Sequence, residues 1–176
     1  MNLLVIRHAI AEDKDAFAAS GRSDDQRPLT EEGRSKMRRA AEGLRLTCPR
    51  VGVLASSPLL RARETADIVA PAFRIRRVEI VEALRPDRPF EELGVWLRRR
   101  IGPNGGGDAD ATIAVVGHEP HLSGLVTWLM SGGSESRMEL KKGGACLLRF
   151  DREPARGEAI LRWALTPSQL RKLANS

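Results

Sequence analysis

Two short apolar runs that each end at a histidine constrain the fold of this chain most. The run Leu-Leu-Val-Ile leads into Arg7-His8, and the run Ile-Ala-Val-Val leads into Gly117-His118. Short runs rich in β-branched residues are typical of strands buried in a parallel sheet. In an open α/β sheet, ligands bind just beyond the carboxyl ends of such strands. The pattern therefore predicts that His8 and His118 meet at one edge of a sheet, although 110 positions separate them.

Strand-like and helix-like segments alternate along the chain, which predicts βαβ units. We expect strands over 2–6, 51–55, 76–81 and 112–116. We expect helices over 30–45, 58–69, 90–101 and 121–130. Two late runs, 145–150 and 159–165, predict an antiparallel pair at one edge, followed by a short helix after Thr166. The polar stretch 12–27 is expected to be a loop. The predicted fold class is α/β, a three-layer α/β/α arrangement with a mostly parallel central sheet and an antiparallel edge.

Length and cysteine usage favour one self-sufficient domain. A chain of 176 residues can bury roughly 70 % of its unfolded surface, so we expect a single domain over 1–176. The glycine-rich stretch 103–110 is expected to be a flexible connection within it. Cys48 and Cys146 lie far apart, which indicates free thiols in a reducing compartment. Because no leader-like segment or long apolar run is present, the expected location is the cytoplasm.

The charge balance indicates the kind of ligand. The net charge of +6 and the pI of about 10.1 favour anionic ligands or partners. Tyrosine is absent and aromatic residues make up only 4 % of the chain, so stacking platforms for nucleic acid are not expected. The one dense basic run, 98–100, falls late in an expected helix, where cations suit the negative end of the dipole. We interpret it as a helix end rather than a nucleic-acid patch.

Arg7-His8 carries the first candidate chemistry. An imidazole is a competent nucleophile toward phosphorus. The alternative is a buried histidine that is satisfied by a backbone carbonyl, which is the commoner role of a lone histidine at a strand end. The adjacent arginine and the second strand-terminal histidine favour phosphoryl chemistry.

A serine pair and an arginine follow the second expected strand. Ser56 and Ser57 can cap the next helix, whose exposed N–H groups favour an anion. Arg61 lies one turn into that helix, and its planar guanidinium can hold a phosphoryl group at two oxygens. The alternative for Arg61 is an ordinary surface arginine. Ser56 and Arg61 are therefore candidate phosphate-binding residues.

Gly117-His118 supplies the third element. The glycine lets the backbone approach a ligand closely, and His118 can donate to a phosphoryl oxygen as negative charge shifts. His121 lies at a helix start, where it either touches substrate or is a polar lining residue. The His118-x-x-His121 spacing lacks a zinc-site frame, and an arginine beside His8 opposes a cation. We expect no metal and no other cofactor.

These motifs together resemble the histidine phosphatase superfamily, also called the phosphoglycerate-mutase-like family. The resemblance spans nearly the whole chain and implies a phosphoglycerate-mutase-like fold. Within the superfamily, the short chain, the segment 27–33 and the ending 163–170 are most similar to the phosphohistidine phosphatases of the SixA type. The motifs that carry the resemblance are Arg7-His8-Ala9, where the family usually has Arg-His-Gly, then Ser56-Ser57-Pro58 with Arg61-Ala62 and Thr65, and finally Gly117-His118.

The resemblance implies a role for each matching residue. His8 is the nucleophile that takes the phosphoryl group, and Arg7, Arg61 and His118 form the charged pocket around it. The family's general acid is a carboxylate after the third strand, and Glu82 occupies that kind of position. The alternative for Glu82 is a solvent-facing strand end.

The resemblance also bears on the substrate. A small chain without lid-forming insertions predicts an open site, which suits phosphohistidine on a protein such as a phosphotransfer domain. Arg27 would reach the pocket or that protein substrate. The alternatives are a small-molecule phosphomonoesterase of the same superfamily, a mutase, or a non-catalytic module that binds phosphorylated partners. We expect a monomer that uses neither nucleic acid nor a membrane as partner.

Overall fold

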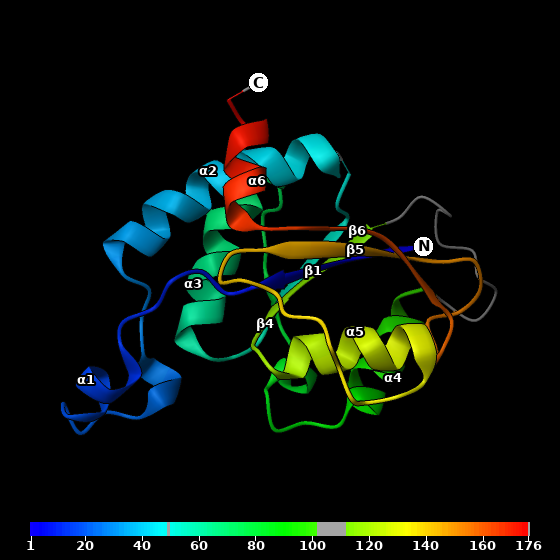
Figure 1. The fold of residues 1–176 in the computed structure, drawn as a ribbon, viewed down its shortest axis with the longest axis horizontal. Coiled ribbons are helices and arrows are strands. Elements are labelled where there is room, and N and C mark those ends of the chain that lie inside the picture. The colour runs from blue at the N-terminus through cyan, green and yellow to red at the C-terminus, as the bar shows by residue number, and fades with distance from the viewer. Residues whose placement is uncertain (49, 102–111, 176) are drawn as a thin grey trace.

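A six-stranded sheet forms the centre of the part of the chain that the computed structural model describes, residues 1–48, 50–101 and 112–175 (Figure 1). In chain order its strands are β1 (Asn2–Arg7), β2 (Val53–Ser56), β3 (Glu79–Ile80), β4 (Thr112–Gly117), β5 (Ala145–Phe150) and β6 (Ala159–Leu165). The spatial order is β3-β2-β4-β1-β5-β6. The first four strands pair in parallel, whereas β5 pairs antiparallel with both β1 and β6. The mostly parallel sheet with an antiparallel edge is thus confirmed.

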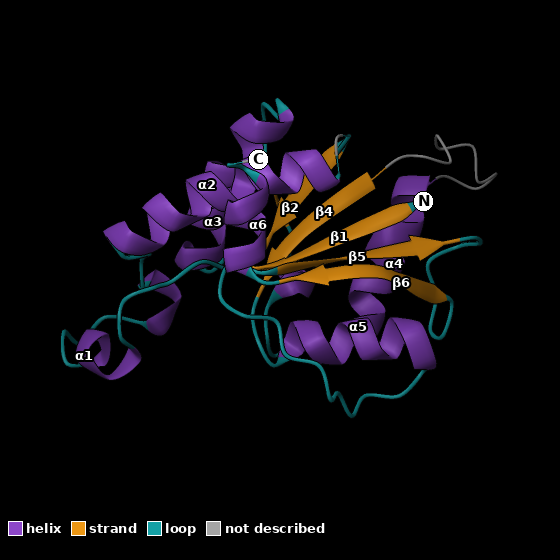
Figure 2. Cartoon of the chain, turned by 45° about the horizontal axis from the view of Figure 1, so that its top comes forward, coloured by secondary structure: helices purple, strands orange, loops and turns teal. Residues whose placement is uncertain are grey.

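Helices cover both faces of the sheet (Figure 2). They are α1 (Lys14–Ala18), α2 (Glu31–Thr47), α3 (Leu60–Val69), α4 (Phe90–Ile101), α5 (His121–Ser131) and α6 (Pro167–Leu173). Side chains of β1 alternate between two apolar clusters, as a pleated strand requires. Leu4 and Ile6 belong to the cluster shared with α2, α3 and α6, whereas Leu3 and Val5 belong to the cluster shared with α4 and α5. The predicted three-layer arrangement is therefore confirmed.

The start of α2 shows why its sequence departs from the usual capping pattern. The Thr30 hydroxyl accepts a hydrogen bond of 2.9 Å from the Gly33 backbone N–H, so Thr30 is the N-cap. Glutamate or glutamine is favoured at the position that Gly33 occupies. A Cβ at Gly33 would lie only 2.1 Å from the backbone oxygen of Ile10. Close packing of α2 on the segment after β1 therefore explains the glycine.

The polar stretch 12–27 is more ordered than the sequence predicts. It contains α1 and a single 3-10 turn, η1 (Asp24–Gln26). The carboxylate of Asp13 accepts hydrogen bonds from the backbone N–H groups of Asp15 and Ala16, and only Phe17 of α1 is buried. One buried side chain gives no apolar periodicity, so the expectation of a loop was wrong for this reason. Asp24 of η1 lines the functional site described below.

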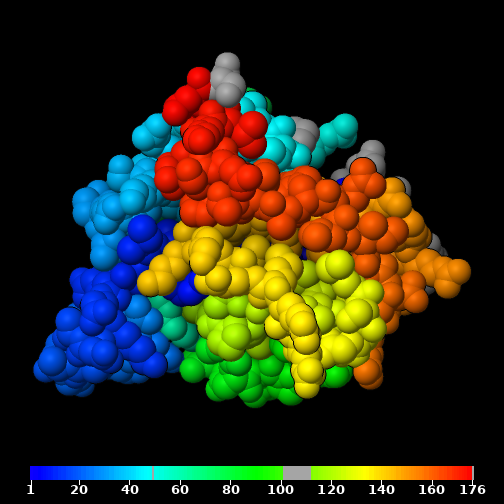
Figure 3. Space-filling view, in the orientation of Figure 1, coloured from blue at the N-terminus to red at the C-terminus, as the bar shows by residue number. Residues whose placement is uncertain are grey.

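Other differences from the expected elements are small. The strand expected over 76–81 is reduced to β3, because β3 pairs with β2 only at Glu79 and Ile80. Phe90–Ile101 forms a helix over the predicted span, and α6 begins with a capping box made by Thr166 and Gln169. α6 lies against α2 on the outside of the molecule (Figure 3). The connection expected over 103–110 lies outside the described residues.

Three further expectations can be compared with the structure. The arginine run 98–100 lies in the last turn of α4, where Arg100 pairs with Glu79 and stacks on Trp96. Cys48 and Cys146 are buried free thiols. Within the described ranges, no helix has both the length and the apolar character needed to cross a membrane.

Candidate active site

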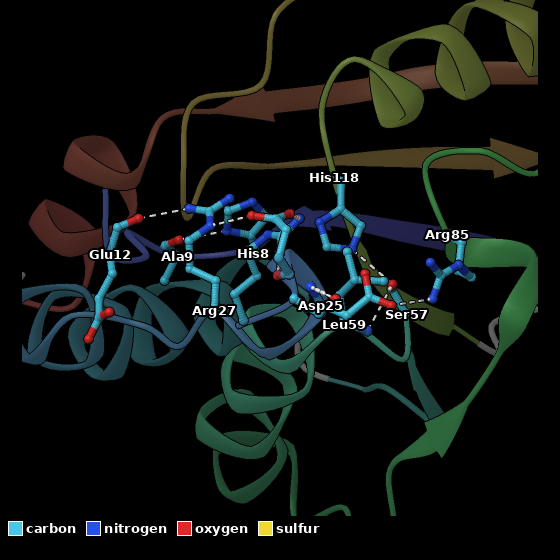
Figure 4. Close-up of polar contacts among 12 residues, drawn as sticks. His8, Ala9, Glu12, Asp25, Arg27, Ser57, Leu59, Arg85 and His118 are labelled. Carbon is cyan, nitrogen blue, oxygen red and sulfur yellow. Dashed lines mark hydrogen bonds and ion pairs between the residues drawn. The ribbon is translucent and has the colours of Figure 1, made fainter. Parts of the chain in front are cut away.

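The parallel pairing of β1 with β4 brings His8 and His118 together. Arg7 lies opposite Gly117 in the strand register, and the His8 backbone N–H donates to the Gly117 carbonyl over 3.0 Å. The imidazole rings of His8 and His118 come directly after these paired strand ends. Their centroids lie 5.2 Å apart and their planes are inclined by 50° (Figure 4). The predicted meeting of the two histidines at the sheet edge is confirmed.

His8 is a buried, neutral imidazole with a defined tautomer. Its Nδ1 lies 2.7 Å from the backbone oxygen of Ala9. Because a carbonyl oxygen only accepts, Nδ1 carries the hydrogen and Nε2 keeps its lone pair. Burial lowers the pKa of His8 to about 3, and the guanidinium groups of Arg61 and Arg7 act in the same direction. His8 therefore presents an unprotonated Nε2 at neutral pH.

His118 is neutral for the same reasons. Burial lowers its pKa to about 2, and the neighbouring His8 and Arg61 act in the same direction. Its Nε2 lies 2.8 Å from the Ser57 hydroxyl (Figure 4). Ser57 comes directly after β2, the neighbour of β4 in the sheet, so the site joins the ends of three parallel strands.

Three arginines surround the imidazoles. Arg61 donates from Nη1 to the Asp24 carbonyl over 2.9 Å and pairs through Nη2 with the Asp24 carboxylate over 3.1 Å. Arg27 pairs through Nε with the other oxygen of that carboxylate over 2.7 Å. Arg7 donates to the backbone oxygen of Leu140 over 2.6 Å. Burial alone would raise the pKa of Asp24, but Arg27 and Arg61 lower it overall, so Asp24 is a bridging anion.

A second contact ties α3 to the chain just after His8. The Ala9 backbone N–H donates to the Thr65 hydroxyl over 3.0 Å, and that hydroxyl donates to the Arg61 carbonyl over 2.6 Å. Thr65 is fully buried. It therefore fixes the first turn of α3, which carries Arg61, relative to the nucleophile candidate.

These side chains line a cavity of about 570 Å³. Three buried nitrogens around it, Arg7 Nε, Arg61 Nε and His118 Nδ1, have no hydrogen-bond partner among the described residues. A buried polar group without a partner costs roughly 1–3 kcal/mol. An anion with several acceptor oxygens would supply the missing partners. The residues that line the cavity are Arg7, His8, Ala11, Glu12, Asp13, Lys14, Asp24, Arg27, Arg61, Pro86, His118, Glu119 and Lys142.

Comparison with known proteins identifies this arrangement. A family model described as "Histidine phosphatase superfamily (branch 1)" matches residues 3–87, which include Arg7, His8 and Arg61. The chain belongs to the histidine phosphatase superfamily. It is also 32% identical over 150 residues to an uncharacterized protein from Picosynechococcus sp. strain PCC 7002, with 85% of each chain covered.

Solved structures share the fold of this histidine phosphatase. The protein histidine phosphatase SixA, complexed with tungstate, is similar with a TM-score of 0.79 at 24% identity, covering 97% of this chain and 99% of that chain. A putative SixA from Agrobacterium tumefaciens gives 0.70 at 20% identity, covering 94% and 97%. A phosphoserine phosphatase mutant from Entamoeba histolytica, complexed with phosphoserine, gives 0.60 at 17% identity, covering 96% and 98%.

The structure brings five of the seven predicted site residues together around the histidine phosphatase cavity, namely Arg7, His8, Arg27, Arg61 and His118. Two others are placed elsewhere. Glu82 is exposed at the start of the 3-10 turn η3 (Glu82–Leu84) and does not line the cavity.

Ser56, the other residue outside the cavity, is fully buried and its hydroxyl donates to the Ser57 carbonyl over 2.9 Å. The serine that reaches the site is its neighbour Ser57. His121 also lies outside the lining. Its Nε2 donates to the Arg88 carbonyl over 3.0 Å and its ring lies against Phe90, so it holds the start of α4.

The sequence offered weak signals for the residues it missed. The sequence pattern predicts Ser57 only as a helix cap, because residue order does not show which of the two serines faces His118. Asp24 lies in a polar stretch without apolar periodicity. The one signal that could have indicated it is its place in the sequence, beside Asp25 and shortly before Arg27. Gly117 also packs closely against the start of α5, because a Cβ there would lie 2.9 Å from Leu122 Cδ2. Its predicted role of letting a ligand approach the backbone stays a prediction.

Proposed function

We propose that this protein is a phosphatase that works through a covalent phosphohistidine on His8 and removes phosphate from phosphohistidine on a protein. One observation carries the proposal. The neutral His8 has an available Nε2, and its ring centroid lies 5.2 Å from that of His118. Both rings lie at a cavity where three buried nitrogens have no hydrogen-bond partner in the part of the chain that the structure describes. A phosphoryl group bound there would meet a nucleophile and cationic donors together.

The reaction has two steps. His8 Nε2 attacks phosphorus, a new P–N bond forms, and the P–N bond to the substrate imidazole breaks. The substrate imidazole leaves with a proton taken from water, which leaves a hydroxide, while the hydrogen on His8 Nδ1 stays on that nitrogen and remains hydrogen-bonded to the Ala9 carbonyl. Water then attacks phospho-His8, and the P–N bond to His8 breaks. A proton released by that water neutralises the hydroxide from the first step, hydrogen phosphate leaves, and His8 Nε2 regains its lone pair. Arg7 and Arg61 hold the phosphoryl oxygens by position and charge.

The lining of the cavity favours a phosphoryl group on a protein over a metabolite. Only Ala11 and Pro86 of the lining residues are apolar. Small-molecule sites are usually lined by apolar and aromatic walls. A site for phosphohistidine on a protein surface needs chiefly to recognise the phosphoryl group. The cationic side chains of this cavity supply that recognition.

One observation favours a small-molecule phosphomonoesterase as a second candidate. An alkoxide needs a proton donor more than an imidazole does, and the Glu12 carboxylate lines the cavity without a partner among the described residues. Asp24 pairs with arginines and Glu119 accepts from Ser123 and Leu140, so both are already engaged. Glu12 would be the donor for a phosphomonoester.

A substrate panel tests the proposal. The protein is incubated, with a chelator present, with a phosphohistidine-bearing protein, phosphoserine and p-nitrophenyl phosphate. The proposal predicts the highest kcat/KM for the phosphohistidine protein and no effect of the chelator. A higher kcat/KM for phosphoserine, lowered by Glu12→Gln, would support the monoesterase instead. Binding without turnover of any compound would indicate a non-catalytic module.

A further inference from the structure

We propose that Ser57 is a positioning residue that fixes the tautomer of His118, so that the second imidazole presents an N–H to the phosphoryl group. This inference rests on the proposed phosphoryl transfer, but it concerns a residue for which no role follows from that reaction alone. Three observations carry it: a hydrogen bond, the burial of both partners, and the polar atom that is left over.

The hydrogen-bonding capacity of Ser57 decides the direction of its bond to His118. A hydroxyl has one hydrogen to donate and two lone pairs. The Ser57 oxygen accepts from the Leu59 backbone N–H over 3.4 Å, and its other contact is His118 Nε2 at 2.8 Å. Within the described residues, His118 Nε2 is thus the only acceptor for the Ser57 hydrogen. The hydroxyl therefore donates, and Nε2 accepts.

Burial makes the opposite tautomer costly. Ser57 is fully buried and His118 is 2 % exposed. If Nε2 carried the hydrogen, the Ser57 hydrogen would have no acceptor and Nδ1 would be a buried lone pair without a donor. Two unsatisfied groups would replace one, at roughly 1–3 kcal/mol each. The arrangement with hydrogen on Nδ1 leaves a single unsatisfied group, which is an N–H.

That N–H lies on the reactive side of the ring. In Figure 4 the nitrogen of His118 that contacts Ser57 points away from His8, and the other ring nitrogen faces the side where His8 lies. The two imidazoles then have complementary free atoms, a lone pair on His8 Nε2 and an N–H on His118 Nδ1. A neutral N–H stabilises the charge that develops on a phosphoryl oxygen during transfer.

The neighbouring serine provides a matched control. Ser56 is equally buried, but its hydroxyl donates to a backbone carbonyl and does not contact either histidine. Ser57→Ala removes the donor to Nε2, whereas Ser56→Ala removes a buried hydroxyl of the same kind outside the site. Loss of packing or of folding stability would affect both variants.

Two-bond 1H–15N spectra of the 15N-labelled protein near pH 7, with His118→Gln to assign the signals, read the tautomer directly. We expect His118 protonated at Nδ1 in the wild type and in Ser56→Ala. In Ser57→Ala we expect the Nε2-protonated form to appear and kcat to fall by about 10-fold to 100-fold, with less than a 3-fold loss in Ser56→Ala.

Two results would overturn the inference: a wild-type His118 protonated at Nε2, or a Ser57→Ala variant that keeps both the Nδ1 tautomer and the kcat of Ser56→Ala. The tautomer is measured on the resting protein. A protein with the expected tautomer but no phosphatase activity on any substrate would therefore contradict the proposed function and leave the inference on the tautomer standing.

Discussion

The imidazoles of His8 and His118 differ from ordinary histidines because they are buried and lie beside guanidinium groups. His8 and His118 stay neutral because their protonated forms would be desolvated and would lie beside guanidinium groups. The pKa values fall from 6.5 to about 3 and about 2. A nucleophile needs this state, since a protonated imidazole has no lone pair for phosphorus.

The same depression of the pKa predicts how stability depends on pH. The unfolded chain binds protons at these histidines below about pH 6.5, whereas the folded protein does not until far lower pH. The free energy of unfolding should therefore fall as pH falls from 7.5 to 5.5, by about 1 kcal/mol for each of the two imidazoles. Denaturant midpoints at both pH values measure it. His118→Gln should remove about one such increment, and a wild-type stability that rises on acidification would contradict the assignment.

At the scale of elements, η1 connects the N-terminal segment to the site. Asp24 holds Arg61 and Arg27, and Asp25 pairs with Arg85 over 2.9 Å at the edge of the same region (Figure 4). Among the residues that the structure describes, the two polar contacts of the Arg61 guanidinium are both with Asp24. The orientation of Arg61 in α3, which we propose binds phosphate, thus depends on a short turn more than thirty residues earlier in the chain.

Replacement of the two aspartates should separate their roles. Asp24→Ala removes the partner that orients Arg61, so we expect the inhibition constant of inorganic phosphate to rise and kcat/KM to fall, each by about 10-fold. Asp25→Ala, which loses only the surface pair with Arg85, should change either constant by less than 3-fold. Inhibition assays on both variants measure this. Tighter phosphate binding in Asp24→Ala would show that the carboxylate competes with substrate instead of orienting Arg61.

Strong local patterns made most elements predictable from the sequence. The buried runs of β1 and β4, the apolar face of α4 and the Thr166 cap carry their own signals, and the place of His8 and His118 follows from two strand ends. The turn η1 and the Ser57–His118 bond depend on contacts between distant segments. Glu82 was assigned by position after the third strand, but a 3-10 turn leaves its side chain exposed.

At the scale of the whole molecule, the order of strands creates the site. β4 is inserted between β1 and β2, so the residues after three parallel strands converge at one edge. The helices on the two faces keep that sheet in place. α6 packs closely on α2, because a Cβ at Gly43 would lie 2.0 Å from the Leu170 backbone oxygen.

Two glycine substitutions test this packing. Both Gly43 in α2 and Gly94 in α4 are within helices, where alanine is intrinsically favoured by up to about 1 kcal/mol. Gly43→Ala must displace α6, so we expect a loss of roughly 1–3 kcal/mol in unfolding free energy. Gly94→Ala meets its nearest atom at 3.4 Å and should be neutral or stabilising. Equal denaturation midpoints for the two variants would contradict the described contact between α2 and α6.

The claim on which the account depends is that His8 itself receives the phosphoryl group. The direct measurement is rapid acid-free quenching of the protein with a phosphohistidine-bearing substrate, followed by peptide mass spectrometry. The account predicts one added phosphoryl group on the peptide that contains His8, stable to alkali and lost in acid, and neither label nor turnover in His8→Ala. Turnover that persists in His8→Ala, or a label on another residue, would contradict it.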